Sequence, residues 1–195
     1  MQLPTKDILA FWFGAWPFDA ALAEKQKDVW FTSNSELDDK ILNMFKPCVE
    51  YALNHDIQLE TLEDKIAYIL LLDQFTRNIF RGDGKAFSGD SKALHACLEI
   101  VHSKAYQSLP EKVAVFACMP LQHSEDHEIQ QVSIDTYSDL VQIHGETAKS
   151  FLKFAHMHKE IIDQFSRYPH RNEALNRTST PQELDYLKDG QRFGQ

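Results

Sequence analysis

Helix-start signals recur along this chain and limit what it can fold into. A hydroxyl residue followed three positions later by a carboxylate can satisfy free N–H groups in the first turn of a helix. This spacing occurs at Ser33–Glu36, Thr61–Asp64 and Thr180–Glu183. Glycine and proline number only seven each, and alternating β-branched runs bounded by turns are missing, so strands have little support. The chain is therefore predicted to be all-α.

About nine helices are predicted from the apolar periodicity between these signals. They cover roughly residues 5–13, 19–31, 35–54, 62–80, 90–103, 110–118, 125–143, 146–167 and 181–188, with boundaries good to about two to four residues. A length of 195 residues is typical of one domain, so residues 1–195 are expected to form a single helical domain.

A six-residue pattern occurs twice, ninety positions apart. Leu72–Arg77 reads Leu-Asp-Gln-Phe-Thr-Arg, and Ile162–Arg167 reads Ile-Asp-Gln-Phe-Ser-Arg. Arg81 is matched at the same offset by Arg171. Such self-similarity is typical of helical units that stack because none can bury its apolar face alone. Two copies also leave chance matching as an alternative.

The repeated pattern places an acid and a base four residues apart, on one helix face. Asp73 with Arg77, and Asp163 with Arg167, could simply be ion pairs that each stabilise their helix by a few tenths of a kcal/mol. Cations near a helix C-terminus also complement its dipole. However, each pattern leads into further arginine, histidine and amide side chains. Guanidinium groups suit carboxylate and phosphate, so an anion pocket is predicted. Its candidate residues are Asp73, Arg77, Asn78, Arg81, Arg167, His170, Arg171 and Asn172.

A histidine-rich segment follows at His123–His127. Ser124 is interpreted as the cap of the next helix, with Glu125 in its first turn, where the dipole favours carboxylates. Capping does not explain His123, which could act as an acid, a base or a hydrogen-bond donor. His123, Glu125 and His170 are therefore the candidate catalytic residues. Ser124 and His158 join the candidate ligand-binding residues.

No metal or cofactor is expected. His158 and Asp163 could combine with His123 and Glu125, but no His-Glu-x-x-His spacing is present. The three cysteines lie far apart, without a Cys-x-x-Cys pair. No glycine-rich phosphate loop occurs either.

The charge and hydropathy of the chain exclude several partners. A formal net charge of −9 argues against nucleic acid, whose phosphates need clustered lysine and arginine. No window approaches the roughly 18 uncharged apolar residues that a membrane span requires. A soluble, cytoplasmic protein without membrane or nucleic-acid partners is expected, and its oligomeric state is left open.

Two further features have mainly structural interpretations. The aromatic clusters at Phe11–Phe13 with Trp16, and at Trp30–Phe31, are interpreted as packing between helices, with a peptide groove as the alternative. Asp90 follows Phe87-Ser88-Gly89 and is interpreted as the cap of its own helix.

Four separated motifs resemble a known family. They run from Leu71 to Gly82, Ala86 to Ala93, Pro120 to Gln130 and Tyr168 to Asn172. In this order they are similar to the bacterial family catalogued as domain of unknown function 924, over essentially the whole chain. The resemblance implies an all-α fold similar to tetratricopeptide repeats, a stack of helix-turn-helix units, with no established activity.

Three functions are compatible with these residues, and whether the protein is an enzyme stays open. The first is a helical-repeat binding protein whose arginines and histidines hold an anionic small molecule or peptide. The second is a hydrolase or transferase that acts on a phosphate- or carboxylate-bearing substrate through histidine and glutamate acid–base groups. The third is a buried polar network that fixes helix register and binds no ligand.

Overall fold

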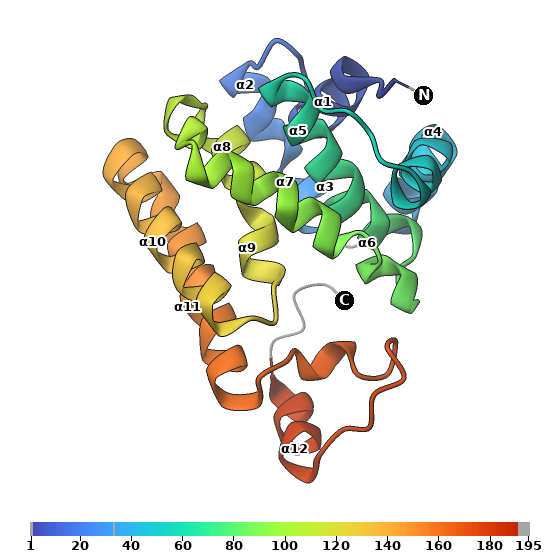
Figure 1. The fold of residues 1–195 in the computed structure, drawn as a ribbon, viewed down its shortest axis with the longest axis vertical. Coiled ribbons are helices and arrows are strands. Elements are labelled where there is room, and N and C mark those ends of the chain that lie inside the picture. The colour runs from blue at the N-terminus through green and yellow to red at the C-terminus, as the bar shows by residue number, and fades with distance from the viewer. Residues whose placement is uncertain (1, 33, 191–195) are drawn as a thin grey trace.

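The computed structural model describes residues 2–32 and 34–190 and is built from helices (Figure 1). No strand occurs in this part of the chain. The α-helices are α1 (Thr5–Phe13), α2 (Ala20–Ala23), α3 (Lys27–Phe31), α4 (Ser35–Asn54), α5 (Leu62–Ile69), α6 (Thr76–Ile79), α7 (Asp90–His102), α8 (Glu111–Ala117), α9 (Met119–His123), α10 (His127–His144), α11 (Lys149–Phe165) and α12 (Pro181–Asp189). Each of the nine predicted segments is helical, so the all-α prediction is confirmed.

The structure divides two predicted segments further. The segment at 19–31 becomes α2, a 3₁₀ turn at Glu24–Gln26 and α3. The segment at 62–80 becomes α5, a π-helical turn η2 (Leu70–Phe75) and α6. Helix α9 was not predicted. It follows directly on α8 and carries Pro120 in its first turn, where the missing N–H costs no hydrogen bond.

Two of the predicted capping boxes are present. The Thr61 hydroxyl accepts from the Asp64 amide at 3.1 Å, and the Asp64 carboxylate accepts from the Thr61 amide at 3.1 Å. Thr180 and Glu183 form the same reciprocal pair at α12. Ser33 lies outside the described residues, and the side chain of Asn34 caps α4. Hydroxyl–carboxylate spacing therefore located the starts of α5 and α12.

Two interpretations of helix caps were wrong. Ser124 does not cap α10, because Asp126 does so by accepting from the amides of Glu128 and Ile129 at 2.8 and 3.0 Å. The carboxylate reaches both amides. Asp90 is the first residue of α7, and its side chain makes no capping bond. Its carboxylate is engaged by arginines from elsewhere in the chain, as described below.

A large hydrophobic core draws on residues from Leu3 to Ala155 and joins most of the helices. It includes the fully buried side chains of Ile8, Ile66, Phe116 and Leu140. Helices α10 and α11 lie side by side along one flank of this body, and α12 lies beyond the end of α11 (Figure 1). A smaller cluster, formed by Ile161, Ile162 and Tyr168 with Phe165 and Tyr186, connects α11 to α12. Within the described residues, none of the helices has the length and hydropathy needed to span a membrane.

The two copies of the repeated pattern lie in different environments. Asp73 is fully buried within the π-helical turn η2. Asp163 is half exposed on α11, where it pairs with Lys159 at 2.7 Å and His127 at 3.3 Å. The repeat therefore does not create two equivalent acid–base pairs. The resemblance to tetratricopeptide repeats stays a prediction.

Gly89 lets the start of α7 approach the π-helical turn closely. A Cβ atom at this position would lie 2.3 Å from the Leu72 carbonyl oxygen and 2.8 Å from the Leu72 Cβ. Only a residue without a side chain fits so near another backbone. This contact places Asp90 next to the helical turn that bears Asp73 and Arg77.

We predict that Gly89→Ala lowers the free energy of unfolding by about 2 kcal/mol, because the added methyl group forces two packed backbones apart. Urea unfolding followed by circular dichroism measures this change. The control is Ser91→Ala, an exposed substitution in the same helix, which should change stability by less than about 0.5 kcal/mol. Equal stabilities for the two variants would contradict the close approach.

Candidate functional site

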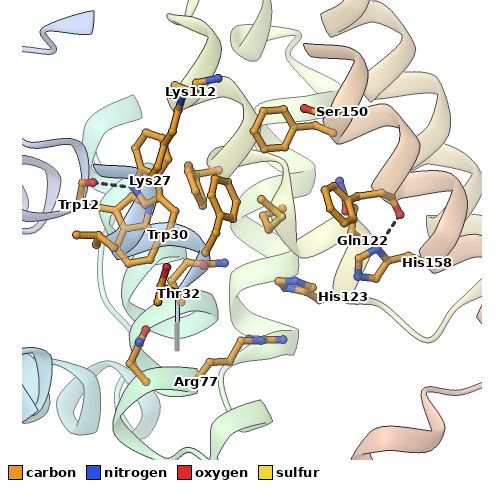
Figure 2. A pocket seen from close by; sticks show the side chains of 18 of the residues that line it. Trp12, Lys27, Trp30, Thr32, Arg77, Lys112, Gln122, His123, Ser150 and His158 are labelled. Atoms are coloured by element: carbon orange, nitrogen blue, oxygen red, sulfur yellow. Dashed lines mark hydrogen bonds between the residues drawn. The ribbon is translucent and has the colours of Figure 1, made fainter. Parts of the chain in front are cut away.

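A cavity of about 820 Å³ opens between α3, η2–α6, the α8–α9 segment and α11 (Figure 2). This volume lies within the range of small-molecule sites, roughly 300 to 1,000 Å³. The cavity walls include seven of the predicted site residues: Arg77, Asn78, Arg81, His123, His158, His170 and Arg171. Residues that are far apart in sequence therefore converge on one hollow.

Asp90 joins the two arginine-bearing segments. Its carboxylate accepts two parallel bonds from the Arg77 guanidinium, at 2.9 and 3.0 Å. It also accepts from Arg171 Nη1 at 3.3 Å. Arg77 and Arg171 are 7% and 6% exposed, so both charges are removed from bulk water and need such a partner. One carboxylate thus holds two guanidinium groups together on the cavity wall.

Asp73 lies beneath the cavity wall and binds His123. The distance from His123 Nδ1 to Asp73 Oδ1 is 2.6 Å. The Asp73 carboxylate also accepts from Gln74 Nε2 at 2.6 Å and lies 3.2 Å from Arg77 Nη1. Burial alone would raise the pKa of Asp73, but the nearby His123 and Arg77 outweigh it and hold that pKa well below its ordinary value. Asp73 is therefore a carboxylate in the folded protein.

The cavity histidines are neutral at pH 7. Burial lowers the pKa of His123 by more than Asp73 raises it. Burial, followed by the neighbouring His123, lowers the pKa of His158 to about 3. Burial, followed by Arg171, lowers the pKa of His170 to about 3. Since Asp73 accepts the Nδ1–H of His123, the Nε2 atom of that ring carries the lone pair. His158 Nδ1 donates to the Phe154 carbonyl at 2.8 Å, which fixes its tautomer in the same way.

The Arg171 side chain is buried, and one of its N–H groups makes no hydrogen bond with the described residues. Its guanidinium carbon lies 4.5 Å from the centre of the Tyr168 ring and 4.7 Å from that of Phe87, as cation–π contacts. Its Nε–H is buried and has no hydrogen-bond acceptor among the described residues. Burial and the charge of Arg77 lower the pKa of Arg171, although a guanidinium stays protonated at any physiological pH. A buried, charged donor without an acceptor is costly, and a ligand oxygen would satisfy it.

Comparisons with known proteins identify the family of this chain and support its fold. The model of the family described as "Bacterial protein of unknown function (DUF924)" matches residues 8–191. The chain belongs to this family. The fold is similar to the solved structure of a protein of unknown function from Agrobacterium tumefaciens, with 33% sequence identity and a TM-score of 0.79. That match covers 95% of this chain and 97% of the other. No curated protein matches the chain.

The family resemblance inferred from the four motifs is thus confirmed, and the motifs acquire structural roles in this DUF924 member. The motif from Leu71 to Gly82 supplies Arg77 and Arg81, and the motif from Ala86 to Ala93 supplies Asp90. Asn78 and Arg81 both bind Asp38 of α4, at 2.8 Å each. The family match leaves the biochemical function unestablished.

Five predicted site residues do not line the cavity: Asp73, which lies beneath its wall, and Ser124, Glu125, Arg167 and Asn172. Glu125 accepts from the Tyr168 amide at 2.8 Å and pairs with Arg177 at 2.7 Å. Arg167 forms two bonds with Glu183 of α12, at 2.6 and 2.8 Å. The Asn172 side chain donates to Ser179 at 3.0 Å, and the Ser124 hydroxyl accepts from the Asp126 amide at 3.2 Å. The contacts of Glu125, Arg167 and Asn172 hold the segment between α11 and α12 in place.

Several residues of the site were not predicted from the sequence. Asp90 was interpreted as a cap, and Gln74 and Tyr168 were not proposed as site residues. Trp30, of α3, was interpreted mainly as packing, with a peptide groove as the alternative, and Phe116, of α8, was not singled out. Both form part of the cavity wall, and their ring centres lie 5.1 Å apart. Their aromatic character signals packing, and nothing local shows that one face borders a cavity. Within the described residues, no group of three or more His, Cys, Asp or Glu side chains is placed to hold a metal ion.

The two copies of the repeated pattern offer a matched test of this electrostatic network. We predict that Asp73→Asn lowers the free energy of unfolding by about 3 kcal/mol at pH 7, because it breaks a buried ion pair. Asp163→Asn, at the exposed copy, should cost less than about 0.5 kcal/mol. Urea denaturation of both variants measures the difference.

The advantage of Asp73 over asparagine should also depend on pH. The folded-state pKa is lowered, so the stabilisation is present at neutral pH and is lost as pH falls below about 4, the unfolded value. The stability difference between wild type and Asp73→Asn should therefore shrink progressively as pH falls below about 4, because the unfolded chain becomes protonated while the folded protein keeps Asp73 ionised. A constant difference between pH 7 and pH 3 would show that the charge of Asp73 is not what stabilises the fold.

Proposed function

We propose that the protein binds a small anionic molecule in the cavity, with Arg77 and Arg171 as anchors. The observation that carries this proposal is the arrangement of Arg171: it is buried, lines the cavity and has an Nε–H without an acceptor among the described residues. An oxyanion that reached that edge, where the Nε atom is buried, would complete its hydrogen bonding. Neighbouring Arg77 would add a second guanidinium to the same wall.

The buried-network alternative explains part of the same geometry. Asp73, His123 and Arg77 satisfy one another, as a structural network requires. However, such a network does not account for the unmatched Arg171 donor, and it does not need an adjoining cavity of about 820 Å³. These two features favour ligand binding over a purely structural role.

The anchor arginine can be distinguished from its neighbour in sequence. A thermal-shift screen of carboxylated and phosphorylated metabolites should identify an anion that stabilises the fold. At a concentration of 100 times its dissociation constant, such an anion should raise the free energy of unfolding by about 2.7 kcal/mol. Arg171→Gln should lower the affinity for that anion about 10- to 100-fold, as measured by isothermal titration, because a charged hydrogen bond is lost. Arg167→Gln should leave the affinity within about twofold, since Arg167 binds Glu183 and does not line the cavity. Equal losses in both variants would remove Arg171 as the anchor.

A second candidate function, a hydrolase or transferase, is favoured by the Asp73–His123 pair. A carboxylate that accepts the Nδ1–H of a neutral imidazole orients the ring and stabilises the imidazolium that forms during proton transfer. Glu125, the expected partner of His123, is bound to Arg177 and does not take this role. In this proposal Asp73, and not Glu125, orients the His123 ring and stabilises its protonated form.

The proton balance of such a reaction is simple. His123 Nε2 would remove a proton from a water or substrate hydroxyl as the oxygen attacks a carbonyl or phosphoryl centre. The bond to the leaving group then breaks, and the leaving group takes the proton back from His123. Arg77 and Arg171 would hold the anionic part of the substrate throughout. This reaction requires no metal.

His123→Gln separates the two candidate functions. If the protein is an enzyme, a p-nitrophenyl ester or phosphate that it turns over should lose about 100-fold or more in kcat, at unchanged affinity. His95→Gln, an exposed substitution on α7, is the control. The wild-type rate should fall as pH drops through the pKa of His123, because protonated Nε2 cannot accept. That limb should lie below the ordinary histidine value of about 6.5, since burial lowers this pKa. A rate that is unaffected by His123→Gln would exclude this catalytic role.

A further inference from the structure

The cavity has two chemically different ends. Arg77 and His123 lie together at one end, while Lys112 lies at the other, with Trp30 along the wall between them (Figure 2). His158 and Arg171 belong to the first end, since the His158 ring lies 6.1 Å from that of His123 and Arg171 shares the Asp90 carboxylate with Arg77. Much of the remaining wall is apolar and comes from Trp12, Trp30, Phe116, Met119 and Phe151, although Glu24, Lys27, Lys112, Thr147 and Ser150 also line the cavity. A ligand that fills this volume therefore meets arginine and histidine donors at one end and extensive aromatic surface along the wall.

The aromatic wall is fixed in position. Trp30 Nε1 donates to the Trp12 carbonyl at 2.9 Å, a bond that connects α3 to α1. The Trp30 and Trp12 rings lie 5.1 and 5.3 Å from the ring of Phe116. Phe154, on α11, also lines the cavity and is 43% exposed. Exposed aromatic surface around a pocket is typical of sites that bind an apolar group.

Charge at the arginine end nearly cancels. The two guanidinium groups of Arg77 and Arg171 face the two carboxylates of Asp73 and Asp90, and the cavity histidines are neutral. The other cations among the described lining residues also have carboxylate partners: Arg81 with Asp38, Lys27 with Glu24, and Lys112 with Glu111. The walls therefore present N–H donors without a large positive excess. Such a site suits one negative charge better than two, because a dianion would add uncompensated charge to a dry site.

We propose that the ligand is an amphipathic monocarboxylate, with its carboxylate at Arg171 and Arg77 and its aliphatic or aryl body against Trp30 and Phe116. This inference rests on the proposed anion-binding function and specifies its chemical class. A body of this kind would displace water from the aromatic wall, and each buried CH₂ group contributes about 0.8 kcal/mol. The apolar contacts supply affinity, and the arginines supply orientation.

A homologous series of probes tests the proposal on the intact chain. Acetate, butyrate, hexanoate and octanoate are titrated separately, and binding is followed by isothermal titration and by tryptophan fluorescence, since Trp12 and Trp30 line the cavity. We expect the affinity to rise about threefold to fourfold for each added methylene group, from the transfer free energy of CH₂. Octanol and octylamine should bind at least about 10-fold more weakly than octanoate, and octyl phosphate should not bind more tightly.

A pair of variants locates the apolar body. Phe154→Ala should lower the affinity for octanoate several-fold and leave the affinity for acetate unchanged, because it removes part of the aromatic wall without altering the arginines. Ile143→Ala is the matched control: its side chain is also 43% exposed but lies on α10, outside the cavity lining. Both substitutions are at exposed positions, so loss of folding does not obscure the comparison.

The outcomes distinguish this inference from the function on which it rests. If acetate and inorganic phosphate bind but chain length has no effect, the amphipathic ligand is excluded and anion binding stands. Tighter binding of octyl phosphate than of octanoate excludes the monocarboxylate. If octanol binds as well as octanoate, or if no probe binds, both proposals fail. Equal effects of Phe154→Ala and Ile143→Ala on octanoate place the apolar body outside this cavity.

Discussion

The ion pairs of Asp90 are the interaction on which the candidate site depends. Arg77 and Arg171 are each more than nine-tenths buried, and two such charges could not lie side by side without an opposite charge between them. Asp90 provides that charge from the first turn of α7, where the helix dipole also favours a carboxylate. The close approach at Gly89 brings α7 near enough to do so. The close packing of α7 at Gly89 and the ion pairs of Asp90 therefore act together to hold Arg77 and Arg171 side by side.

Much of the fold could be predicted from the sequence, because local signals specify helices. Thr61 and Thr180 mark helix starts through bonds that involve only neighbouring residues. The π-helical turn at Leu70–Phe75 was not predicted, since its apolar spacing resembles that of an ordinary helix. Helix α9 was missed because it spans only Met119–His123. The π-helical turn and helix α9, neither of which was predicted, thus carry Asp73 and His123.

The candidate site was only partly predictable, because similar local sequences have different long-range partners. Arg77 and Arg167 occupy the same place in the repeated pattern, yet one meets Asp90 and borders the cavity while the other meets Glu183 of α12. Neither partner can be inferred from spacing along the chain. The same holds for His123, whose partner Asp73 is fifty residues away. The residue types led to the prediction of an anion-binding pocket, but only tertiary packing decides which arginines face the cavity.

The aromatic contacts of Arg171 restrict how any ligand can reach it. Its guanidinium carbon lies over the rings of both Tyr168 and Phe87, so these rings occupy space above the flat surface of the group. A ligand would therefore have to approach through the rim that carries the N–H bonds, where Nη1 already binds Asp90 and Nε is buried. A trigonal oxyanion can align two oxygens with such a rim, whereas a halide, being spherical, gains nothing from its planarity. Replacement by lysine would keep the charge and lose this directionality.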